Sequence, residues 1–273
     1  MGGKVNNIVA DLHMHSTFSD GKFSPEQIDA LFCNLNFQAI SITDHDTLDH
    51  VNYISKNKDK FSLDIIPGVE ISCKFDGIDM HLLVYFADKS INFLTDYFKS
   101  YRLLRIHRVE EIISKLRKDG VALNSKNILD NFNNPSRLHV AQELVSSGYA
   151  KSIKLAFKNF LIKSSKYYVP INKISLPDLV DCLKPFDCLT SIAHPIISLG
   201  KKKLDLILNM NIDGVESFHP SHDLKDEAIL LSICKENNLL VTGGSDFHGW
   251  NKNDSRLGRY GLDNSKFKTF QLN

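Results

Sequence analysis

Cysteine is scarce in this 273-residue sequence, and its spacing does not suit cross-linking. There are five cysteines, an odd number, and no C-x-x-C pair occurs. Isolated thiols of this kind argue against a disulfide framework and against a thiolate zinc site. We therefore expect reduced, mostly buried thiols, as is usual for a cytoplasmic protein.

A strong net charge and long hydrophobic runs are also missing. The 33 Lys and Arg residues are balanced by 32 Asp and Glu residues. This balance gives no bulk attraction for long nucleic acid, although it leaves room for a local basic pocket. No apolar run approaches transmembrane length, and residues 1–10 do not have the pattern of a signal peptide. We therefore expect cytoplasmic localisation and no membrane partner.

Histidine, in contrast, is plentiful, and most of the eleven histidines lie beside acids at the ends of short apolar runs. Neutral imidazoles and carboxylates are common ligands of zinc, manganese and iron. A lone histidine near a strand end is more often structural, but burying this many polar groups without a metal would leave them unsatisfied. The sequence therefore predicts a site for more than one metal ion. The groups are His13 and His15 with Asp20, His45 in T-D-H-D, Glu70 with His81, His194, and Asp246 with His248.

Short apolar runs alternate with helical patterns over much of the chain. With 42% hydrophobic residues the chain can bury one large core. The alternation favours an α/β fold with mainly parallel strands, and Asp76-Gly77 predicts a hairpin turn. Strands are predicted at Ile8–Leu12, Ala39–Ile42, Leu63–Ile71, Met80–Phe86, Leu189–Ala193, Gly214–Phe218 and Leu239–Thr242, and helices at Pro25–Phe32, Leu176–Leu183, Leu204–Met210 and Leu224–Glu236.

The middle of the chain, residues 90–166, has a different pattern. It contains no convincing strand. One long helix or two are predicted at Asn92–Lys118, and further helices at Arg137–Ser146 and Ile153–Ile162. Gly120 and Gly148 have the position of glycines that end helices. The sequence therefore predicts a helical insertion, residues 90–166, between two strand-rich parts, residues 1–89 and 167–273.

Strand geometry indicates how distant ligands could meet. Side chains at positions i and i+2 of a strand point the same way, so His13 and His15 can reach one metal, as can Asp246 and His248. In a parallel barrel the carboxyl ends of all strands open onto one face. His45 and His194 also follow apolar runs, and we expect them on that face.

Five motifs, in this order, resemble the PHP family, which is named for polymerase and histidinol phosphatase. They are D-L-H-M-H-S-T-F-S-D at 11–20, T-D-H-D at 43–46, P-G-V-E-I-S at 67–72, A-H-P at 193–195 and G-S-D-F-H at 244–248. The resemblance implies a distorted seven-stranded β/α barrel with three metal sites at one end and the helical insertion as a substrate cap. It also implies two to three divalent ions, which could be manganese, iron or zinc.

The resemblance assigns the metal ligands by position. The first metal would take His13, His15, Glu70 and Asp246, the second Asp20, His45 and His248, and the third Glu70, His81 and His194. Within this set, Asp20, His45, Glu70 and Asp246 are the expected catalytic residues.

Two segments resemble a subfamily of small phosphoesterases that act on 3′,5′-nucleoside bisphosphates and on the 5′ ends of short RNAs. They are S-R-L-H-V-A-Q-E-L-V at 136–145 and Y-Y-V-P at 167–170; the subfamily usually has G-R-P-H where this chain has S-R-L-H. The residues expected to bind substrate phosphate are Arg137, His139, Lys166 and His222, and His219 and His222 are candidates for the leaving-group acid.

The chemistry expected of such a site is hydrolysis. Two metals lower the pKa of a shared water and clamp the oxygens of a phosphoryl group, so attack by a metal-bridging hydroxide needs no covalent nucleophile. Neither a G-x-S-x-G elbow nor a P-loop is present. The expected function is therefore a metal-dependent phosphoesterase for nucleotides or the 5′ ends of short RNA. The alternatives are a histidinol-phosphate phosphatase, which the insertion disfavours, and a non-catalytic metal-stabilised module, which the complete ligand set disfavours.

Overall fold

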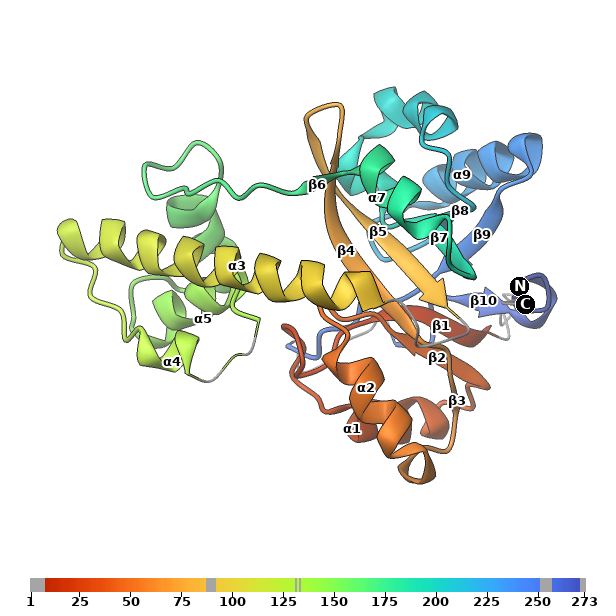
Figure 1. Ribbon diagram of the computed structural model, residues 1–273, viewed down its shortest axis with the longest axis horizontal. Helices are drawn as coiled ribbons and strands as arrows, with labels where there is room; N and C mark the ends of the chain where they lie inside the picture. Colours follow the sequence, from red (N-terminus) through yellow and green to blue (C-terminus); the bar gives the residue numbers. More distant parts are fainter. Residues whose placement is uncertain (1–7, 87–91, 131, 133, 251–256, 271–273) are drawn as a thin grey trace, which may run out of the picture.

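A computed structural model describes residues 8–86, 92–130, 132, 134–250 and 257–270. A strand-rich part lies on the right of Figure 1, and a helical part built around the long helix α3 extends from it to the left. The strands are β1 (Ile8–Met14), β2 (Ala39–Ile42), β3 (Asp64–Ile65), β4 (Gly68–Phe75), β5 (Ile78–Phe86), β6 (Ile174–Ser175), β7 (Cys188–Ile192), β8 (Gly214–Phe218), β9 (Leu240–Gly243) and β10 (Leu262–Asp263).

Helices α1 and α2 lie beside the strands of one sheet, and α7 and α9 lie beside the strands of the other (Figure 1). The helices are α1 (Pro25–Asn34), α2 (Asp49–Lys56), α3 (Asn92–Lys118), α4 (Lys126–Leu129), α5 (Arg137–Ser146), α6 (Ile153–Ala156), α7 (Leu176–Leu183), α8 (Pro195–Ser198), α9 (Leu224–Asn237) and α10 (Asn264–Phe267), with 3₁₀ segments η1 (Lys58–Lys60) and η3 (Lys201–Asn209) and a π-helical segment η2 (Phe157–Leu161).

The strands form two mixed sheets, which confirms the α/β class. One sheet has the order β10-β1-β2-β3 and the other β6-β4-β5-β7-β8-β9. Most neighbouring pairs are parallel, as predicted, but β5 runs antiparallel to both β4 and β7. This reversal follows from the predicted hairpin at Asp76-Gly77, whose φ values of 48° and 73° are those of a type I′ turn.

The two sheets meet at the ends of β1 and β4. A parallel bridge pairs Met14 with Phe247, and a second pairs His45 with Glu70. The backbone N–H of Asp246 also donates to the carbonyl of His13 at 2.9 Å. These contacts bring the ligand-bearing ends of both sheets together, although the strand ladders of the described residues do not by themselves establish one closed seven-stranded barrel.

Several elements follow directly from local sequence. Ser24 caps α1 in a capping box with Gln27, and Pro25 takes the first helical position, as predicted. Gly120 and Gly148 have positive φ after α3 and α5, as expected of glycines that end helices. The single strand predicted at Leu63–Ile71 is wrong, because the segment divides into β3 and β4 on either side of Ile66-Pro67.

The helical part has an apolar cluster of its own. It contains Val109, Ile112, Leu116, Val140, Leu144 and Leu161, and it is separate from the clusters that surround the sheets. The described residues between 92 and 166 contain no strand, as predicted, but the last predicted helix, Ile153–Ile162, changes to the π-helical η2 at Phe157. The domain boundary predicted at residues 89–90 lies outside the described residues.

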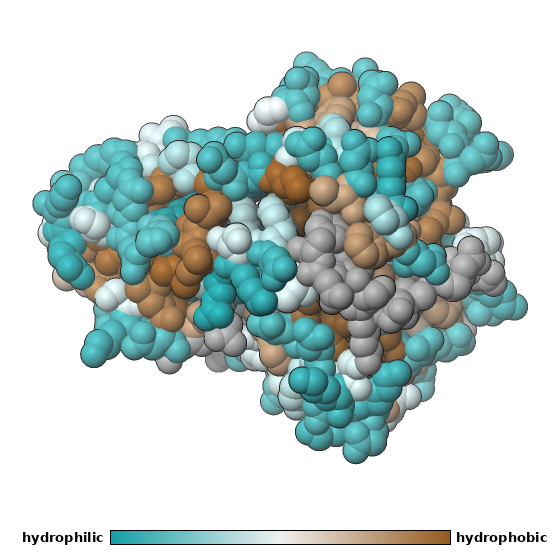
Figure 2. All heavy atoms as spheres, viewed as in Figure 1, coloured by the Kyte–Doolittle hydropathy of each residue, from teal (hydrophilic) through white to brown (hydrophobic). Residues whose placement is uncertain are grey.

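The surface is mostly hydrophilic on the face shown in Figure 2, and apolar residues show in smaller patches on both the helical part and the strand-rich part. No helix among the described residues is long and apolar enough to cross a membrane.

Candidate metal centre and substrate pocket

Most of the predicted ligands lie at the carboxyl ends of strands or on the loops that follow them, whereas Glu70 and His81 lie within β4 and β5, nearer the amino ends of these strands. His13 and His15 lie near the end of β1, and both side chains are fully buried. His194 follows β7 and Asp246 follows β9, with φ values of 31° and 49°. Positive φ is costly for residues other than glycine, and such strain is concentrated at functional sites.

Glu70, in β4, lies at the centre of the cluster. Its Oε1 is 2.8 Å from His81 Nδ1 and 3.0 Å from His194 Nε2. Its Oε2 is 3.0 Å from His45 Nδ1, 3.3 Å from His15 Nε2 and 3.4 Å from His13 Nε2. Each carboxylate oxygen therefore faces a different set of imidazoles, which is the arrangement that a bridging ligand needs.

Asp20 and Asp246 lie on two sides of this centre. Asp246 Oδ1 is 3.2 Å from His15 Nε2 and 3.5 Å from His13 Nε2. Asp20 Oδ1 is 3.3 Å from His248 Nε2 and 3.8 Å from His15 Nδ1. Both carboxylates therefore share histidines with the central group.

The donor atoms of the described residues form five overlapping groups. Within each group, all donor atoms lie within 4.8 Å of one another. His81 and His194 face the same oxygen of Glu70 but belong to different groups. The groups are His15, Asp20, His45 and His248; His13, Glu70 and His194; His13, Glu216 and His219; His13, His15 and Asp246; and His45, Glu70 and His81.

The cluster has the unsatisfied atoms expected of a metal site. Buried polar atoms normally have hydrogen-bond partners. Here several buried ligand atoms have none in the described structure: His13 Nε2, both ring nitrogens of His15, His45 Nδ1, His81 Nδ1 and Glu70 Oε2. Mixed nitrogen and oxygen donors fit transition-metal ions, so the residues present suit the group that the sequence predicts.

The electrostatics also suit cation binding. Burial alone would raise the pKa of the Glu70 carboxyl, but the imidazoles of His45, His81 and His13 outweigh it and hold that pKa well below its usual value. Burial lowers the pKa of His81 to about 4, against the opposing charge of Glu70. An ionised carboxylate is the state in which Glu70 would bind a metal. Although burial opposes it, the neighbouring carboxylates raise the pKa values of the other ligand imidazoles, so metal binding would release protons from His13, His15, His45, His194 and His248.

Glu216, in β8, orients the cluster and was missed by the sequence analysis. It accepts from His13 Nδ1 at 2.9 Å and from the backbone N–H of His194 at 2.7 Å. Such partners fix the orientation and tautomer of a metal-binding histidine. The sequence feature that could have indicated Glu216 is an acid within the apolar strand G-V-E-S-F at 214–218.

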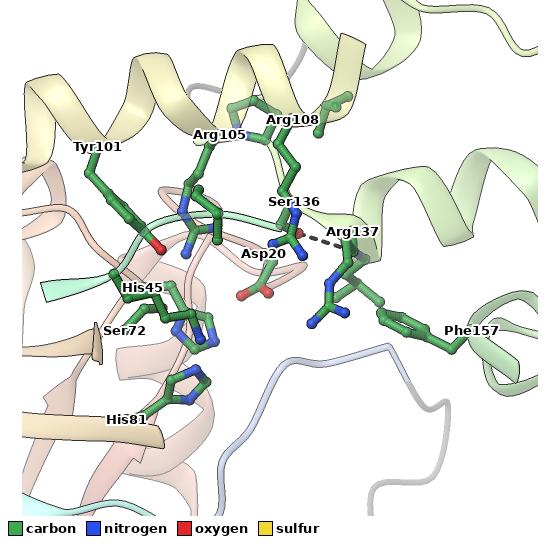
Figure 3. A pocket seen from close by; sticks show the side chains of 15 residues that line it. Asp20, His45, Ser72, His81, Tyr101, Arg105, Arg108, Ser136, Arg137 and Phe157 are labelled. Carbon is green, nitrogen blue, oxygen red and sulfur yellow. Dashed lines mark hydrogen bonds between the residues drawn. The ribbon is translucent and has the colours of Figure 1, made fainter. Parts of the chain in front are cut away.

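A cavity of about 160 Å³ opens beside the ligand cluster, between it and the helical part. Asp20, His45 and His81 line one side, and three arginines face them from the other (Figure 3). Arg105 and Arg108 come from α3, and Arg137 is the first residue of α5. Arg137 was predicted; Arg105 and Arg108 were missed, although R-I-H-R at 105–108 places two arginines three residues apart on one helix face.

The other predicted phosphate-binding residues lie in different surroundings. His139 is buried, stacks on Phe132 and accepts from the backbone N–H of Ser136, so it caps α5. His222 is also buried, with Nδ1 3.0 Å from the Ser217 carbonyl oxygen.

Lys166 is not brought to the cavity. It is largely exposed and pairs with Asp119 at 2.6 Å. The lysine that does line the cavity is Lys173. His219 is closer to the ligands than His222, with Nε2 3.5 Å from Asp246 Oδ2.

The family model for the PHP domain matches residues 11–168 of this sequence. The chain belongs to the PHP domain family. This match covers His13, His15, Asp20, His45, Glu70 and His81. It also covers all three arginines of the cavity.

Known relatives of this PHP protein act on phosphate esters. It is 29% identical over 251 residues to a 5′-3′ exoribonuclease of Haemophilus influenzae, a match covering 88% of this chain and 91% of the relative. It is 27% identical over 246 residues to a 3′,5′-nucleoside bisphosphate phosphatase of Chromobacterium violaceum, covering 87% and 86%.

A solved structure agrees with these relationships. A metal-dependent phosphoesterase of Bifidobacterium adolescentis superposes with a TM-score of 0.84 at 26% identity, over 95% of this chain and 94% of that one. This chain is therefore a PHP-family phosphoesterase, a hydrolase of phosphate esters that depends on metal.

Proposed function

We propose that this PHP enzyme removes a phosphate from 3′,5′-nucleoside bisphosphates and acts on the 5′ ends of short RNAs. The observation that carries the proposal is a group of three arginines beside a metal-binding cluster, in one cavity. The names of the relatives support the same substrate class.

The cavity has the charge expected of a site for a second phosphate. Arg108 Nε donates to the Val169 carbonyl at 2.8 Å, and Arg137 Nη1 donates to the Leu161 carbonyl at 3.2 Å. Neither guanidinium has a carboxylate within ion-pair distance in the described part of the chain. Burial, together with the nearby charge of Arg137, lowers the pKa of Arg108 to about 10. An anionic group between the two arginines would relieve this repulsion and accept their free donors.

Arg105 has a different role, because its charge is already paired. It lies against Tyr101 and binds the buried carboxylate of Asp46, the residue after His45. Asp46 also accepts from the backbone N–H of Ser72 at 2.7 Å. This contact ties helix α3 to the loop that carries a metal ligand, so Arg105 positions the cap over the metal centre.

We further propose two to three divalent ions, which could be manganese, iron or zinc, held by the nine predicted ligands. When bound, such ions lower the pKa of water and stabilise charge on a phosphoryl group. Glu70, whose two oxygens face different imidazoles, would hold these ions at the centre of the cluster, while Glu216 fixes the ring of His13. Asp20, His45 and His81 form the face of the cluster toward the cavity.

The proposed architecture is one distorted barrel, residues 1–89 and 167–273, with residues 90–166 as a cap. The bridges Met14–Phe247 and His45–Glu70 support closure of the two sheets into one barrel. The separate apolar cluster of the helical part supports its assignment as a distinct unit.

A substrate panel tests the proposed function. Phosphate release by metal-reconstituted protein would be measured with adenosine 3′,5′-bisphosphate, adenosine 5′-phosphate, a 5′-phosphorylated RNA trinucleotide and histidinol phosphate. We expect the highest kcat/KM for the bisphosphate, together with shortening of the RNA. A preference for histidinol phosphate would refute the proposal, as would a lack of phosphate release from every compound.

Arg137→Ala tests whether the arginine group binds the second phosphate. A contact between a buried arginine and a phosphate contributes about 1.5–3 kcal/mol, so KM for the bisphosphate should rise roughly tenfold to a few hundredfold. An aryl phosphate, which has only the reacting group, should change little. Arg117→Ala, at an exposed position of the same helical part, is the matched control. Equal losses on both substrates would place Arg137 at the reacting phosphate instead.

A further inference from the structure

A second cavity of about 390 Å³ lies next to the substrate pocket and shares part of its wall. Arg108, Arg137, Ile171 and Lys173 line both cavities. The second cavity, called here the lysine cavity, is completed by Lys74, Asp79, Lys163 and Tyr168. The two arginines assigned to the second phosphate therefore stand at the junction between the two spaces.

The lysine cavity is strongly positive although the whole chain is nearly neutral. Five cationic side chains line it (Lys74, Arg108, Arg137, Lys163 and Lys173), against the single carboxylate of Asp79. That carboxylate is already shared, with Oδ2 2.8 Å from Lys163 and Oδ1 3.4 Å from Lys173. The remaining positive charge has no counter-ion among the described residues that line the cavity.

Both arginines also lie over one ring at the junction. The guanidinium of Arg108 is 5.5 Å and that of Arg137 is 5.8 Å from the centre of the Tyr168 ring. These contacts hold the two groups in place where one cavity opens beside the other. An anion held by the arginines would thus be next to a space of a size typical of small-molecule sites.

We propose that the lysine cavity binds a third phosphate of the substrate, in the space next to the group held by Arg108 and Arg137. This inference rests on the proposed function, which places the second phosphate at the arginines. A nucleoside 3′,5′-bisphosphate has no third phosphate to bind there. A third phosphate could come from a polyphosphate on the nucleotide or from the next phosphodiester of an RNA chain.

The double variant Lys74→Gln/Lys163→Gln tests this proposal without changing the shared wall. Three substrates would be compared: adenosine 3′,5′-bisphosphate, adenosine 3′-phosphate 5′-diphosphate and a 5′-phosphorylated RNA trinucleotide. Each lysine contributes a partly screened phosphate contact, so KM for a substrate with a third phosphate should rise about tenfold. KM for the bisphosphate should stay within about twofold, because that substrate does not reach the lysines.

Lys202→Gln/Lys235→Gln is the matched control, because it removes the same charge at exposed positions of η3 and α9. A change confined to the diphosphate substrate would identify a polyphosphate as the source of the third phosphate, and a change confined to the RNA would identify the next phosphodiester. Unchanged KM for both would overturn the proposal, as would an equal change in the control variant.

Binding of inorganic tripolyphosphate, measured by calorimetry, gives a second readout that does not depend on turnover. We expect the Lys74→Gln/Lys163→Gln variant to bind it about tenfold more weakly than the unaltered protein does. Equal binding would overturn the assignment of the lysine cavity. If the unaltered enzyme does not hydrolyse the bisphosphate, the proposed function fails, whereas tripolyphosphate binding still decides whether this cavity takes phosphate.

Discussion

Glu70 is the side chain that connects the most ligands of the metal centre. Its two oxygens face five histidines at distances of 2.8–3.4 Å. The side chain is 1% exposed, so water cannot replace these contacts. Removing its charge should therefore affect more than one metal position at once.

Replacing a residue that only supports a metal ligand typically lowers activity by roughly 10–100-fold. Glu70→Gln should lower kcat/KM for the bisphosphate by more than this. The fold should persist, because the apolar clusters do not include this side chain. Phosphate release and circular dichroism on the same sample test this. Glu143→Gln, a buried carboxylate of α5 that contacts Asn127 and Ser147, is the control and should retain activity. Near-normal turnover of Glu70→Gln would mean that Glu70 is structural.

Glu216 acts one layer farther out, through His13 and the backbone of His194. Glu216→Gln removes the charge that fixes the His13 ring, so metal affinity should fall by about 10–100-fold. Competition with a chelator of known affinity measures this change. Asp213→Asn, which alters a carboxylate just before β8 that contacts Thr190 and no ligand, should leave the affinity unchanged. An unaltered affinity in Glu216→Gln would show that Glu216 does not support the site.

Helix α3 is the element that joins the helical part to the metal centre. Arg105 on this helix and Asp46 on the loop after β2 form a buried pair, with side chains 12% and 0% exposed. Breaking a buried ion pair by removing one partner leaves an uncompensated charge in a medium where desolvation is expensive. The pair therefore contributes to the position of α3 as well as to stability.

Asp46→Asn should reduce the free energy of unfolding by about 3–5 kcal/mol. Urea denaturation of chelator-treated protein measures this without a contribution from metal binding. Adding Arg105→Met to the same protein should recover much of the loss, because no unpaired charge then remains. A loss below about 1 kcal/mol in Asp46→Asn would show that water or another group replaces the carboxylate.

The elements that the sequence predicted well have strong local signals. Helices α3 and α5 have the predicted bounds, Asn92–Lys118 and Arg137–Ser146, and a glycine with positive φ follows each of them. Strands β6 and β10 were missed because two-residue strands carry no alternating pattern. The predicted hairpin accounts for the antiparallel pairing of β5 with β4, whereas the antiparallel pairing of β5 with β7 was missed because it depends on a strand far away in the sequence.

At the scale of the whole molecule, the cluster of histidines and acids could be predicted from the sequence and the pocket beside it could not. Each ligand lies in a short motif of histidines and acids, so the residue types alone indicated metal. Arg105 and Arg108 on α3 are far away in the sequence from Arg137 and from Lys173, and only the packing of the helical part against the sheets brings all four to one cavity. Lys166 was predicted to bind phosphate together with Arg137, but it pairs with Asp119 instead.

The number of metal ions that activity requires tests the central claim, a multinuclear centre built from both sheets. Metal-free protein would be titrated with manganese while phosphate release from adenosine 3′,5′-bisphosphate and bound metal per chain are measured on the same samples. The nine ligands predict that activity saturates at two to three ions per chain, since about four to six donors, counting water or phosphate, complete each site. Saturation at a single ion, or full activity without metal, would contradict the account.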